Sequence, residues 1–451
     1  MKKFISILCA VTLVCFALTL FGCGGAAKET SAKQINYTER TFTIIDKLVN
    51  NKVGDFYSYF DGNMQKQVSQ SDVQTLWGNI LLNYGKFDYY KTDLSFVSQD
   101  GYQIVDVPCM FEKGSITLRL TLNTKGEISG FFITDNTTAS NSMQLANDVE
   151  VDFGSAEYPL KGSLTLPEGD GPFPAVILVH GSGPNDRNEQ IGPNLPFMDL
   201  AEQLSAQGIV VLRYDKRSYT HANKLASLTE MTVQEETIED VLYAVEYLKT
   251  LDMINPNQIF IAGHSLGGYL MPRIAQQTPD ACGYILLAAS ARPLEDLMLE
   301  QTEYILSLEK NLDEASRNKL LKQTADFVAI VKSLTPDSDY TAEQLGGAPV
   351  SYWLDLQSYD PIQEIQKVDK SFLILQGGRD YQVTKTDYAL WQEAFDQYSD
   401  VHFRYYDNLN HLFMSGTGKS VPSEYQQKGT VDTAVGTDIA NFILDHAALQ
   451  E

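Results

Sequence analysis

The chain has 451 residues, of which 43% are hydrophobic and 20% are charged, and its formal net charge is −24. This length favours two domains over one, and the apolar fraction suffices for a sizeable core, which excludes a chain that is disordered throughout. So acidic a surface repels phosphate backbones and has no basic stripe to offset it. We therefore expect no binding to nucleic acid.

Residues 1–22 are expected to form a lipoprotein signal peptide. Two lysines precede an apolar run of 18 residues. Because this length is near the minimum for a membrane span, a permanent transmembrane anchor is the alternative to a cleaved signal peptide. The run leads into "LFGC", which resembles the bacterial lipobox, where a peptidase cuts before a cysteine that is then acylated. The resemblance implies that Cys23 anchors the protein to the outer face of the cytoplasmic membrane, at the cell surface or on the periplasmic side. Residues 23–36 then comprise the lipidated cysteine and a flexible tether.

Of the five cysteines, Cys9 and Cys15 belong to the expected signal peptide and Cys23 to the lipobox, and the other two do not suggest a disulfide framework or a metal site. Cys109 and Cys282 fall in segments assigned to different domains, and we expect no disulfide between them. The chain contains no cysteine spacing typical of a metal site and no HExxH motif, so neither a metal nor another cofactor is expected.

Residues 37–135 are expected to form a small α+β domain. Apolar residues recur at helical spacing in "TFTIIDKLV" and in "SDVQTLWGNILLNY", the second of which begins with Ser71 as a helix cap. Four short β-type runs follow, separated by turn signals such as "QDG" and "NTKGE", and strands in sequence favour an antiparallel sheet. The segment resembles the cystatin-like or nuclear-transport-factor-like domains that precede hydrolases in bacterial lipoproteins. That resemblance implies a shape and no chemistry.

After a linker over residues 136–147, strands alternate with helices through residues 148–451. The alternation predicts an α/β fold with a mostly parallel sheet, opened by a hairpin. Residues 292–360 interrupt it with acidic, amphipathic helical sequence. We expect these helices to form a lid, because long insertions are disproportionately functional; a peripheral helical bundle is the alternative.

The stretch "IFIAGHSLGG" places a serine where a strand should turn into a helix. Ser265 stands between Gly263 and Gly267 in the pattern G-x-S-x-G. A β-branched strand before the pattern and a helix after it are the context in which it marks a nucleophile elbow. There the glycines leave room in a tight turn, and strain directs the serine outward. Ser265 is the predicted nucleophile.

A serine hydroxyl needs a base to take its proton, and the chain contains six histidines. His264 lies on the elbow itself, where its side chain should point away. His402 falls within a strand, His446 at the end of the last helix, and His221 in a loop after the second core strand. His411, in "DNLNHLFM" just past the last core strand, is the predicted base.

The imidazole needs a carboxylate that fixes its tautomer. Asp380, in "GGRDYQV", follows a core strand, and the order serine, aspartate, histidine is that of α/β-hydrolases. Asp360, in "SYDP", is the rival acid, but it precedes its strand and should lie at the opposite end of the sheet. Asp387 is expected in the following helix. We therefore assign Asp380 as the acid.

Two backbone N–H groups are predicted to hold an oxyanion. Leu266 supplies the first as the residue after the nucleophile, and the turn in "VHGSGP" supplies the second from Ser182 or Gly181. The carboxylates of Glu235 and Glu236 could in principle recognise a substrate amine, but we expect them on a solvated helix face.

Residues 148–450 resemble α/β-hydrolases of the dienelactone-hydrolase and acyl-aminoacyl-peptidase-like branch. The resemblance implies an eight-stranded, mostly parallel sheet with helices on both faces and a helical lid. Asp215 and Arg217 match a structural pair near the site, and Ser218 stands where relatives usually have glycine. The matching segments are "LKGSLTLP", "FPAVILVHGSGPNDR", "LRYDKR", "AGHSLGG", "SYDP", "GGRDYQV" and "NLNHLF". The site residues carried over are the triad Ser265, Asp380 and His411 and the oxyanion donors Leu266 and Ser182.

These observations predict an extracytoplasmic serine hydrolase that cleaves a small ester or acylated substrate through an acyl-enzyme, with the membrane contacted only through the lipid anchor. A serine peptidase or aminopeptidase of the same fold is the alternative, although such enzymes usually carry a larger specificity domain than the ~100 residues found here. A catalytically inactive binding protein is the third possibility, and the complete triad argues against it.

Overall fold

The computed structural model describes residues 35–450 except positions 93, 95, 100, 113, 136–143, 226–227 and 310–311. These residues form two compact units that divide between Gln144 and Leu145. The expected signal peptide, Cys23 and most of the expected tether and linker lie outside the described residues. Within the described ranges, no helix is long and apolar enough to cross a membrane.

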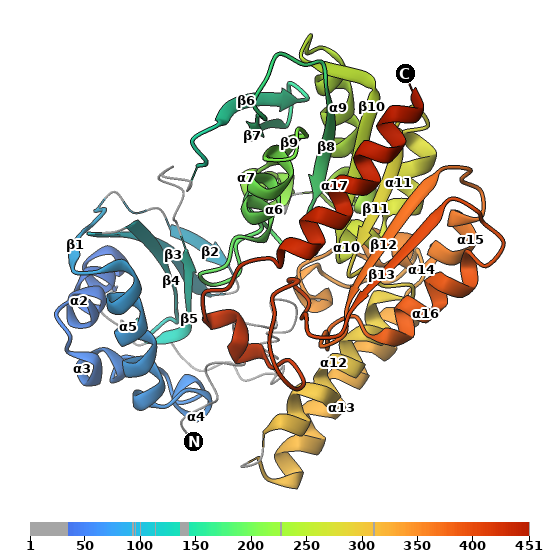
Figure 1. The fold of residues 1–451 in the computed structure, drawn as a ribbon. Coiled ribbons are helices and arrows are strands. Elements are labelled where there is room, and N and C mark those ends of the chain that lie inside the picture. Colours follow the sequence, from blue (N-terminus) through green and yellow to red (C-terminus); the bar gives the residue numbers. More distant parts are fainter. Residues whose placement is uncertain are drawn as a thin grey trace. The chain divides into compact units, whose positions relative to one another are not determined.

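The first unit is an α+β domain in which the helices precede the strands (Figure 1). Its antiparallel sheet has the order β1-β3-β4-β5, with β2 pairing with β3, so the first of the four predicted runs is divided into two strands. The helices are α2 (Tyr37–Val49), α3 (Val53–Tyr57), α4 (Met64–Gln67) and α5 (Gln70–Tyr84). The strands are β1 (Phe87–Tyr90), β2 (Phe96–Gln99), β3 (Tyr102–Phe111), β4 (Gly114–Leu122) and β5 (Ile128–Asp135).

Helix α5 is capped by Ser69, so the prediction of Ser71 as its cap was wrong. Ser69 Oγ accepts a hydrogen bond from the Asp72 N–H at 3.2 Å, and the Asp72 carboxylate accepts one from the Ser69 N–H at 2.9 Å. This reciprocal pair is a capping box, which requires an acid or amide three residues after the cap. Ser71 has an amide, Gln74, at the same spacing, so the sequence offered two caps, and the chain uses the one whose partner is an acid.

The second unit is built on an eight-stranded sheet with the order β13-β12-β11-β10-β8-β9-β7-β6. The strands from β13 to β9 are parallel, whereas β6 and β7 form an antiparallel hairpin at the edge. The predicted α/β-hydrolase fold is thereby confirmed. The strands are β6 (Asp148–Gly154), β7 (Pro159–Thr165), β8 (Phe173–Val179), β9 (Val210–Tyr214), β10 (Ile254–His264), β11 (Gly283–Leu287), β12 (Ser371–Gly377) and β13 (Val401–Tyr406).

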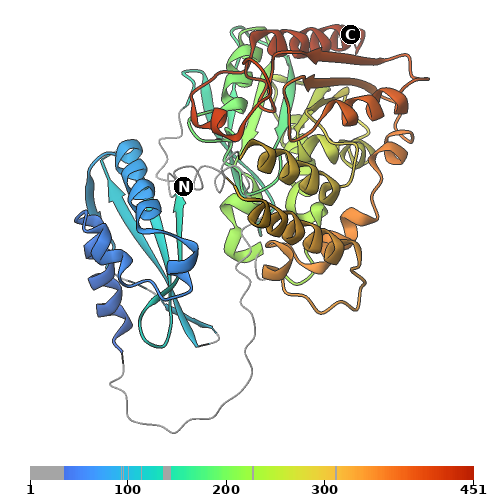
Figure 2. The ribbon, with the colours of Figure 1, turned by 90° about the horizontal axis from the view of Figure 1, so that it is seen from below.

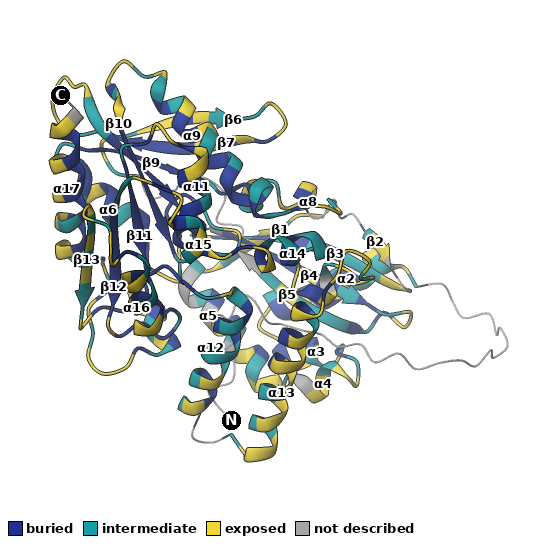
Figure 3. Ribbon diagram, turned by 90° about the vertical axis from the view of Figure 1, so that its right-hand side faces the viewer, coloured by how far each residue is buried: buried dark blue, intermediate teal, exposed yellow. Residues whose placement is uncertain are grey.

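Helices cover both faces of this sheet. On one face pack α6 (Pro196–Ser205) and α17 (Thr433–Ala447); on the other pack α9 (Glu239–Lys249), α11 (Met271–Gln277) and α16 (Lys385–Ala394). Because parallel strands are covered on both sides, they are continuous apolar runs such as "FPAVILV" in β8. Figure 3 shows the central strands as the most buried part of the unit.

The insertion between β11 and β12 is helical, as predicted. It contains α12 (Leu294–Leu308), α13 (Glu314–Lys332), α14 (Val350–Gln357) and α15 (Pro361–Ile365). Figure 2 shows α12 and α13 side by side as a hairpin. Met298, Phe327 and Trp353 join the main hydrophobic core, so the insertion is packed onto the hydrolase unit. Its function as a lid stays a prediction.

Candidate active site

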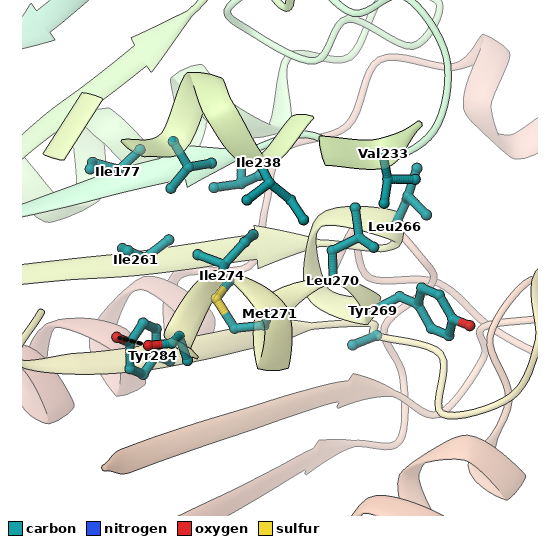
Figure 4. Packing of buried hydrophobic residues seen from close by; sticks show 14 of the residues in the cluster. Ile177, Val233, Ile238, Ile261, Leu266, Tyr269, Leu270, Met271, Ile274 and Tyr284 are labelled. Carbon is teal, nitrogen blue, oxygen red and sulfur yellow. Dashed lines mark hydrogen bonds between the residues drawn. The ribbon is translucent and has the colours of Figure 1, made fainter. Parts of the chain in front are cut away.

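Ser265 occupies a strained turn between β10 and α10 (Leu266–Tyr269). Its φ of 52° and ψ of −113° lie where side chains are rarely tolerated, and its N–H donates to the carbonyl of Leu287 at the end of β11. Backbone strain of this kind costs roughly 1–3 kcal/mol and persists only where the surroundings enforce it. Figure 4 shows Leu266 beside Val233, and Leu270, which follows the short helix, also lies in the hydrophobic core.

The glycines that flank Ser265 are required by close backbone contacts. A Cβ at Gly263 would lie 2.4 Å from the carbonyl carbon and oxygen of Gly267. A Cβ at Gly267 would lie 2.6 Å from Val179 O and 2.7 Å from His180 O, at the end of β8. Atoms of the main chain cannot yield to such contacts, so the elbow can form only with glycine at both positions.

His411 and Asp380 meet at the carboxyl edge of the sheet. His411 Nδ1 lies 2.6 Å from Asp380 Oδ2, and both side chains are buried. The other carboxylate oxygen of Asp380 accepts hydrogen bonds from the N–H groups of Gln382 and Val383 at 2.7 and 3.1 Å. These bonds hold the carboxylate in one orientation, so Nδ1 of His411 keeps its proton and Nε2 is left as the basic nitrogen.

The loop that carries His411 lies against the nucleophile elbow. The imidazole rings of His264 and His411 are 4.7 Å apart, and His264 Nε2 lies 3.0 Å from the carbonyl oxygen of His411. Because His264 directly precedes Ser265, this contact packs the loop that carries the predicted base against the elbow that carries the predicted nucleophile. Among the described residues, no hydrogen bond joins Ser265 Oγ to His411; in enzymes without substrate that bond is often long.

The turn after β8 has one backbone donor that is already occupied. The N–H of Gly181 donates to Glu189 Oε1 at 2.6 Å, so it is not available to a substrate. Gly181 lies next to the elbow, since a Cβ on it would be 3.2 Å from Ser265 Cβ. This geometry favours Ser182 over Gly181 as the second oxyanion donor. Leu266, the first residue of α10, has no intrahelical partner for its N–H and can supply the first.

Glu189 forms a buried ion pair with His264 that the sequence did not reveal. Glu189 Oε2 lies 2.9 Å from His264 Nδ1, and both residues are at most 5% exposed. Burial opposes charge on both groups, but their mutual attraction outweighs it, so the pKa of Glu189 is lowered and the pKa of His264 is raised. Glu189 also has a φ of 50°, a second strained residue at the site. It ties the β8 turn to the elbow.

Asp215 and Arg217, which the resemblance gives as a structural pair near the site, bind different partners. Asp215 binds Arg187, with an ion-pair distance of 2.8 Å, whereas Arg217 binds Asp240 and Glu239. Asp215 reaches Arg187 in the loop after β8, whereas Arg217 reaches the first turn of α9. Both pairs hold the "YDKR" loop beside the site without offering a group to a substrate.

Glu236 is buried, so the prediction that it lies on a solvated helix face was wrong. Its carboxylate lies 2.6 Å from Lys216 Nζ, and the two side chains are 7% and 1% exposed. Glu236 belongs to a short π-helical segment, η1 (Gln234–Ile238), which precedes α9 and rotates this side chain inward. Glu235 instead caps the start of the segment by accepting hydrogen bonds from Thr232.

The rival acids and the remaining histidines have structural partners elsewhere. Asp360 caps helix α15 by accepting from the N–H groups of Ile362 and Gln363, and Asp387 lies in the first turn of α16. His180 is buried beside Phe197, and burial lowers its pKa to about 4.

Cys109 and Cys282 are both free.

Within the described ranges, one set of side chains could hold a metal ion: Asp400, His402 and His446, whose ligand atoms lie within 4.8 Å of one another. They belong to the start of β13 and the end of α17. Ser265 follows the carboxyl end of β10, and β13 runs parallel to β10 in the same sheet. The cluster lies at the amino end of β13. It is therefore at the opposite end of the strands from Ser265 and takes no part in the candidate active site.

Comparison with known proteins identifies the family to which the second unit is similar. A family model described as "Serine aminopeptidase, S33" matches residues 172–417. Esterase EstD of Thermotoga maritima is 34% identical over 417 residues, which are 90% of this chain and 95% of that protein. The chain belongs to the S33 family of α/β-hydrolases. The S33 match spans the elbow, Asp380 and His411 in one continuous segment.

Three further similarities are weaker or cover less of the chain. The family "Protein of unknown function (DUF3887)" matches residues 42–131, within the first unit. The quorum-quenching protein AidA of Acinetobacter baumannii is 26% identical over 120 residues, which are 27% of this chain and 36% of that protein. Est1E from Butyrivibrio proteoclasticus, a solved structure, has a TM-score of 0.43 at 19% identity and covers 66% of this chain and 99% of its own.

Proposed function

We propose that this S33-family chain is a serine hydrolase that cleaves carboxylic esters through an acyl-enzyme on Ser265. The observation that carries the proposal is the 2.6 Å contact between His411 Nδ1 and Asp380 Oδ2 at the edge of the sheet where Ser265 turns outward. A histidine oriented in this way beside a strained serine is the arrangement that activates a serine hydroxyl.

In the proposed mechanism, His411 Nε2 takes the proton of Ser265 while Oγ attacks the ester carbonyl carbon. The negative charge that develops on the carbonyl oxygen is stabilised by the N–H groups of Leu266 and Ser182. The proton then passes from His411 to the departing alcohol, which leaves the acyl-enzyme. Water, activated by the same imidazole, attacks the acyl group and releases the carboxylic acid.

The nucleophile is tested with a fluorophosphonate probe. Ser265→Ala should abolish labelling and lower kcat by roughly 10⁶, because loss of the nucleophile removes the covalent route. Ser290→Ala removes another buried serine hydroxyl, at the end of β11 near the same edge of the sheet, and should leave labelling intact. Labelling or esterase activity that survives in Ser265→Ala would overturn the proposal.

Ester preference is proposed because the relative aligned over nearly the whole chain is named an esterase. The family description instead names an aminopeptidase, and this favours peptide hydrolysis as the second candidate. One acyl group presented both as an aryl ester and as an anilide separates the two. We expect a much higher kcat/KM for the ester, and a preference for amino-acyl anilides would transfer the proposal to a peptidase.

For its location, we propose that Cys23 is acylated and holds the hydrolase at the outer face of the cytoplasmic membrane. The support is the "LFGC" segment after the apolar run. Cys23→Ala should move the protein from the detergent phase to the aqueous phase, because one lipid signal is lost with the thiol. Precursor that is cleaved as in the wild type, with the protein still entirely in the membrane fraction, would contradict lipid anchoring.

A further inference from the structure

The carbonyl oxygen of Gly181 accepts a hydrogen bond from Lys216 Nζ at 3.0 Å. This carbonyl and the N–H of Ser182 belong to one peptide unit, and that unit is trans. The C=O and N–H of a planar trans peptide point in opposite directions. The contact with Lys216 therefore sets the direction in which the Ser182 N–H points.

Lys216 is itself held by a buried carboxylate, that of Glu236. Its ammonium lies 2.6 Å from Glu236 Oε1, and its side chain is 1% exposed. A buried ammonium without a carboxylate would be strongly unfavourable, so the two charges depend on each other. Glu236 comes from η1, where the π-helical turn places its carboxylate inward.

Glu236 connects this pair to the helical insertion. Its Oε2 accepts a hydrogen bond from the hydroxyl of Tyr352 at 3.2 Å, and Tyr352 lies on α14. Burial, together with the adjacent Glu236 charge, raises the pKa of Tyr352, so the hydroxyl stays protonated and can donate. A continuous set of contacts therefore runs from α14 through two buried charges to the Gly181–Ser182 peptide.

Other contacts hold the same turn but do not reach the insertion. Asn185 Nδ2 lies 3.3 Å from the Gly181 carbonyl and also contacts the carbonyls of Ser182 and Gly183. Glu189 holds the N–H on the other side of Gly181. These bonds shape the turn, whereas Lys216 connects its carbonyl to α14.

We propose that Lys216 is a positioning residue for the oxyanion donor, and that Glu236 and Tyr352 make the alignment of the Ser182 N–H depend on the seating of α14. The inference rests on the proposed function, because it assumes that Ser182 stabilises an oxyanion. Such a donor acts mainly in the transition state, so its misalignment should lower kcat and leave KM nearly unchanged.

The first experiment separates positioning from stability. Lys216→Met alone should unfold at a lower temperature, because it leaves Glu236 buried without its cation. The double variant Lys216→Met, Glu236→Gln removes both charges and should recover much of that stability. We expect its kcat to stay lower by roughly 10- to 100-fold, with KM within about twofold, since loss of one oxyanion donor outright costs about 10²–10³ in kcat. A stable double variant with wild-type kcat would overturn the proposal.

The second experiment tests the connection to the insertion with two tyrosines. Tyr352→Phe removes the hydroxyl bound to Glu236, whereas Tyr359→Phe removes a buried hydroxyl that donates to the carbonyl of Tyr269 at 2.8 Å. Both variants lose one hydrogen bond between the insertion and the core. We expect Tyr352→Phe to lower kcat by about 3- to 10-fold and Tyr359→Phe to leave it within about twofold. Equal effects would overturn the connection.

The third measurement reports on the oxyanion itself. A trifluoromethyl ketone adds to the serine and places a negatively charged oxygen where the transition-state oxygen sits. Its affinity should fall in parallel with kcat in Tyr352→Phe and in the double variant. A fall in kcat without a loss of this affinity would contradict the proposal. Failure of the proposed function would look different, because Ser265→Ala would then retain activity.

Discussion

Asp380 and Asp360 carry the same chemical group in different surroundings. Asp380 is buried and contacts His411, whereas Asp360 caps a short surface helix. Asp380→Asn should lower kcat by roughly 10⁴ without unfolding the protein, because the amide no longer holds the correct imidazole tautomer. Asp360→Asn is the matched control and should leave kcat unchanged, since an asparagine at an N-cap still accepts hydrogen bonds. Steady-state kinetics on an aryl ester measures kcat for both variants. A larger loss of kcat in Asp360→Asn than in Asp380→Asn would disprove the assignment of Asp380 as the acid.

The Glu189–His264 pair predicts how stability depends on pH. The raised pKa of His264 contributes stability that is complete below its ordinary value of 6.5 and is lost as pH rises through the folded value. The lowered pKa of Glu189 contributes stability that is complete above 4.5 and is lost as pH falls through its folded value. The pair should therefore stabilise the fold most between these two values.

Glu189→Gln tests this dependence. The difference in melting temperature between wild type and Glu189→Gln should be largest between pH 4.5 and 6.5 and should shrink as the pH rises through the raised pKa of His264. Glu202→Gln, which changes an exposed carboxylate on α6, is the control and should show a small difference at every pH. A difference for Glu189→Gln that does not change with pH would argue against a charged pair.

At the scale of elements, the elbow depends on the packing of α10 against the end of β8. Gly267→Ala would drive a methyl group into the carbonyl oxygens of Val179 and His180, so we expect a loss of about 1–3 kcal/mol in stability and most of the activity. Gly208 has a φ of 86° and no atom within 4 Å of a built Cβ. Gly208→Ala should therefore cost only about 1–2 kcal/mol, from strain, and retain kcat. Thermal melts and steady-state kinetics of both variants separate the effect of the steric clash at position 267 from that of the backbone strain at position 208.

At the scale of the whole molecule, the two units have separate cores. One hydrophobic cluster lies entirely before residue 129, and the others lie after residue 150. We therefore expect the fragment 144–451 to fold alone and to hydrolyse a small aryl ester with a kcat within about threefold of the full chain. If the first unit recruits a large or surface-bound substrate, only activity on that substrate should fall. A large loss of kcat on the small ester would show that the first unit helps to build the active site.

The parts predicted well from the sequence are those whose pattern is local. Parallel strands buried on both faces read as apolar runs, and the elbow combines a strand, a tight glycine turn and a helix within "IFIAGHSLGG". The helix cap at Ser69 was missed although its signal, an acid three residues later, was in the sequence. Glu236 was misplaced because charged side chains on helices are usually solvated, whereas this one lies in a π-helical turn and pairs with the buried Lys216.

The sequence by itself determined the fold class and the two-part organisation, and it predicted a nucleophile, acid and base in α/β-hydrolase order, because each follows from patterns along one chain. Tertiary structure alone decided which partner each buried polar group finds. It showed that the N–H of Gly181 is occupied by Glu189, and that Lys216 holds the carbonyl next to Ser182. Glu189 and Lys216 are 27 residues apart and converge on Gly181, one at its N–H and the other at its carbonyl, because β8 and β9 are adjacent in the sheet. Hydrogen bonds and ion pairs act over about 3 Å, and only the folded chain brings such distant residues within that distance.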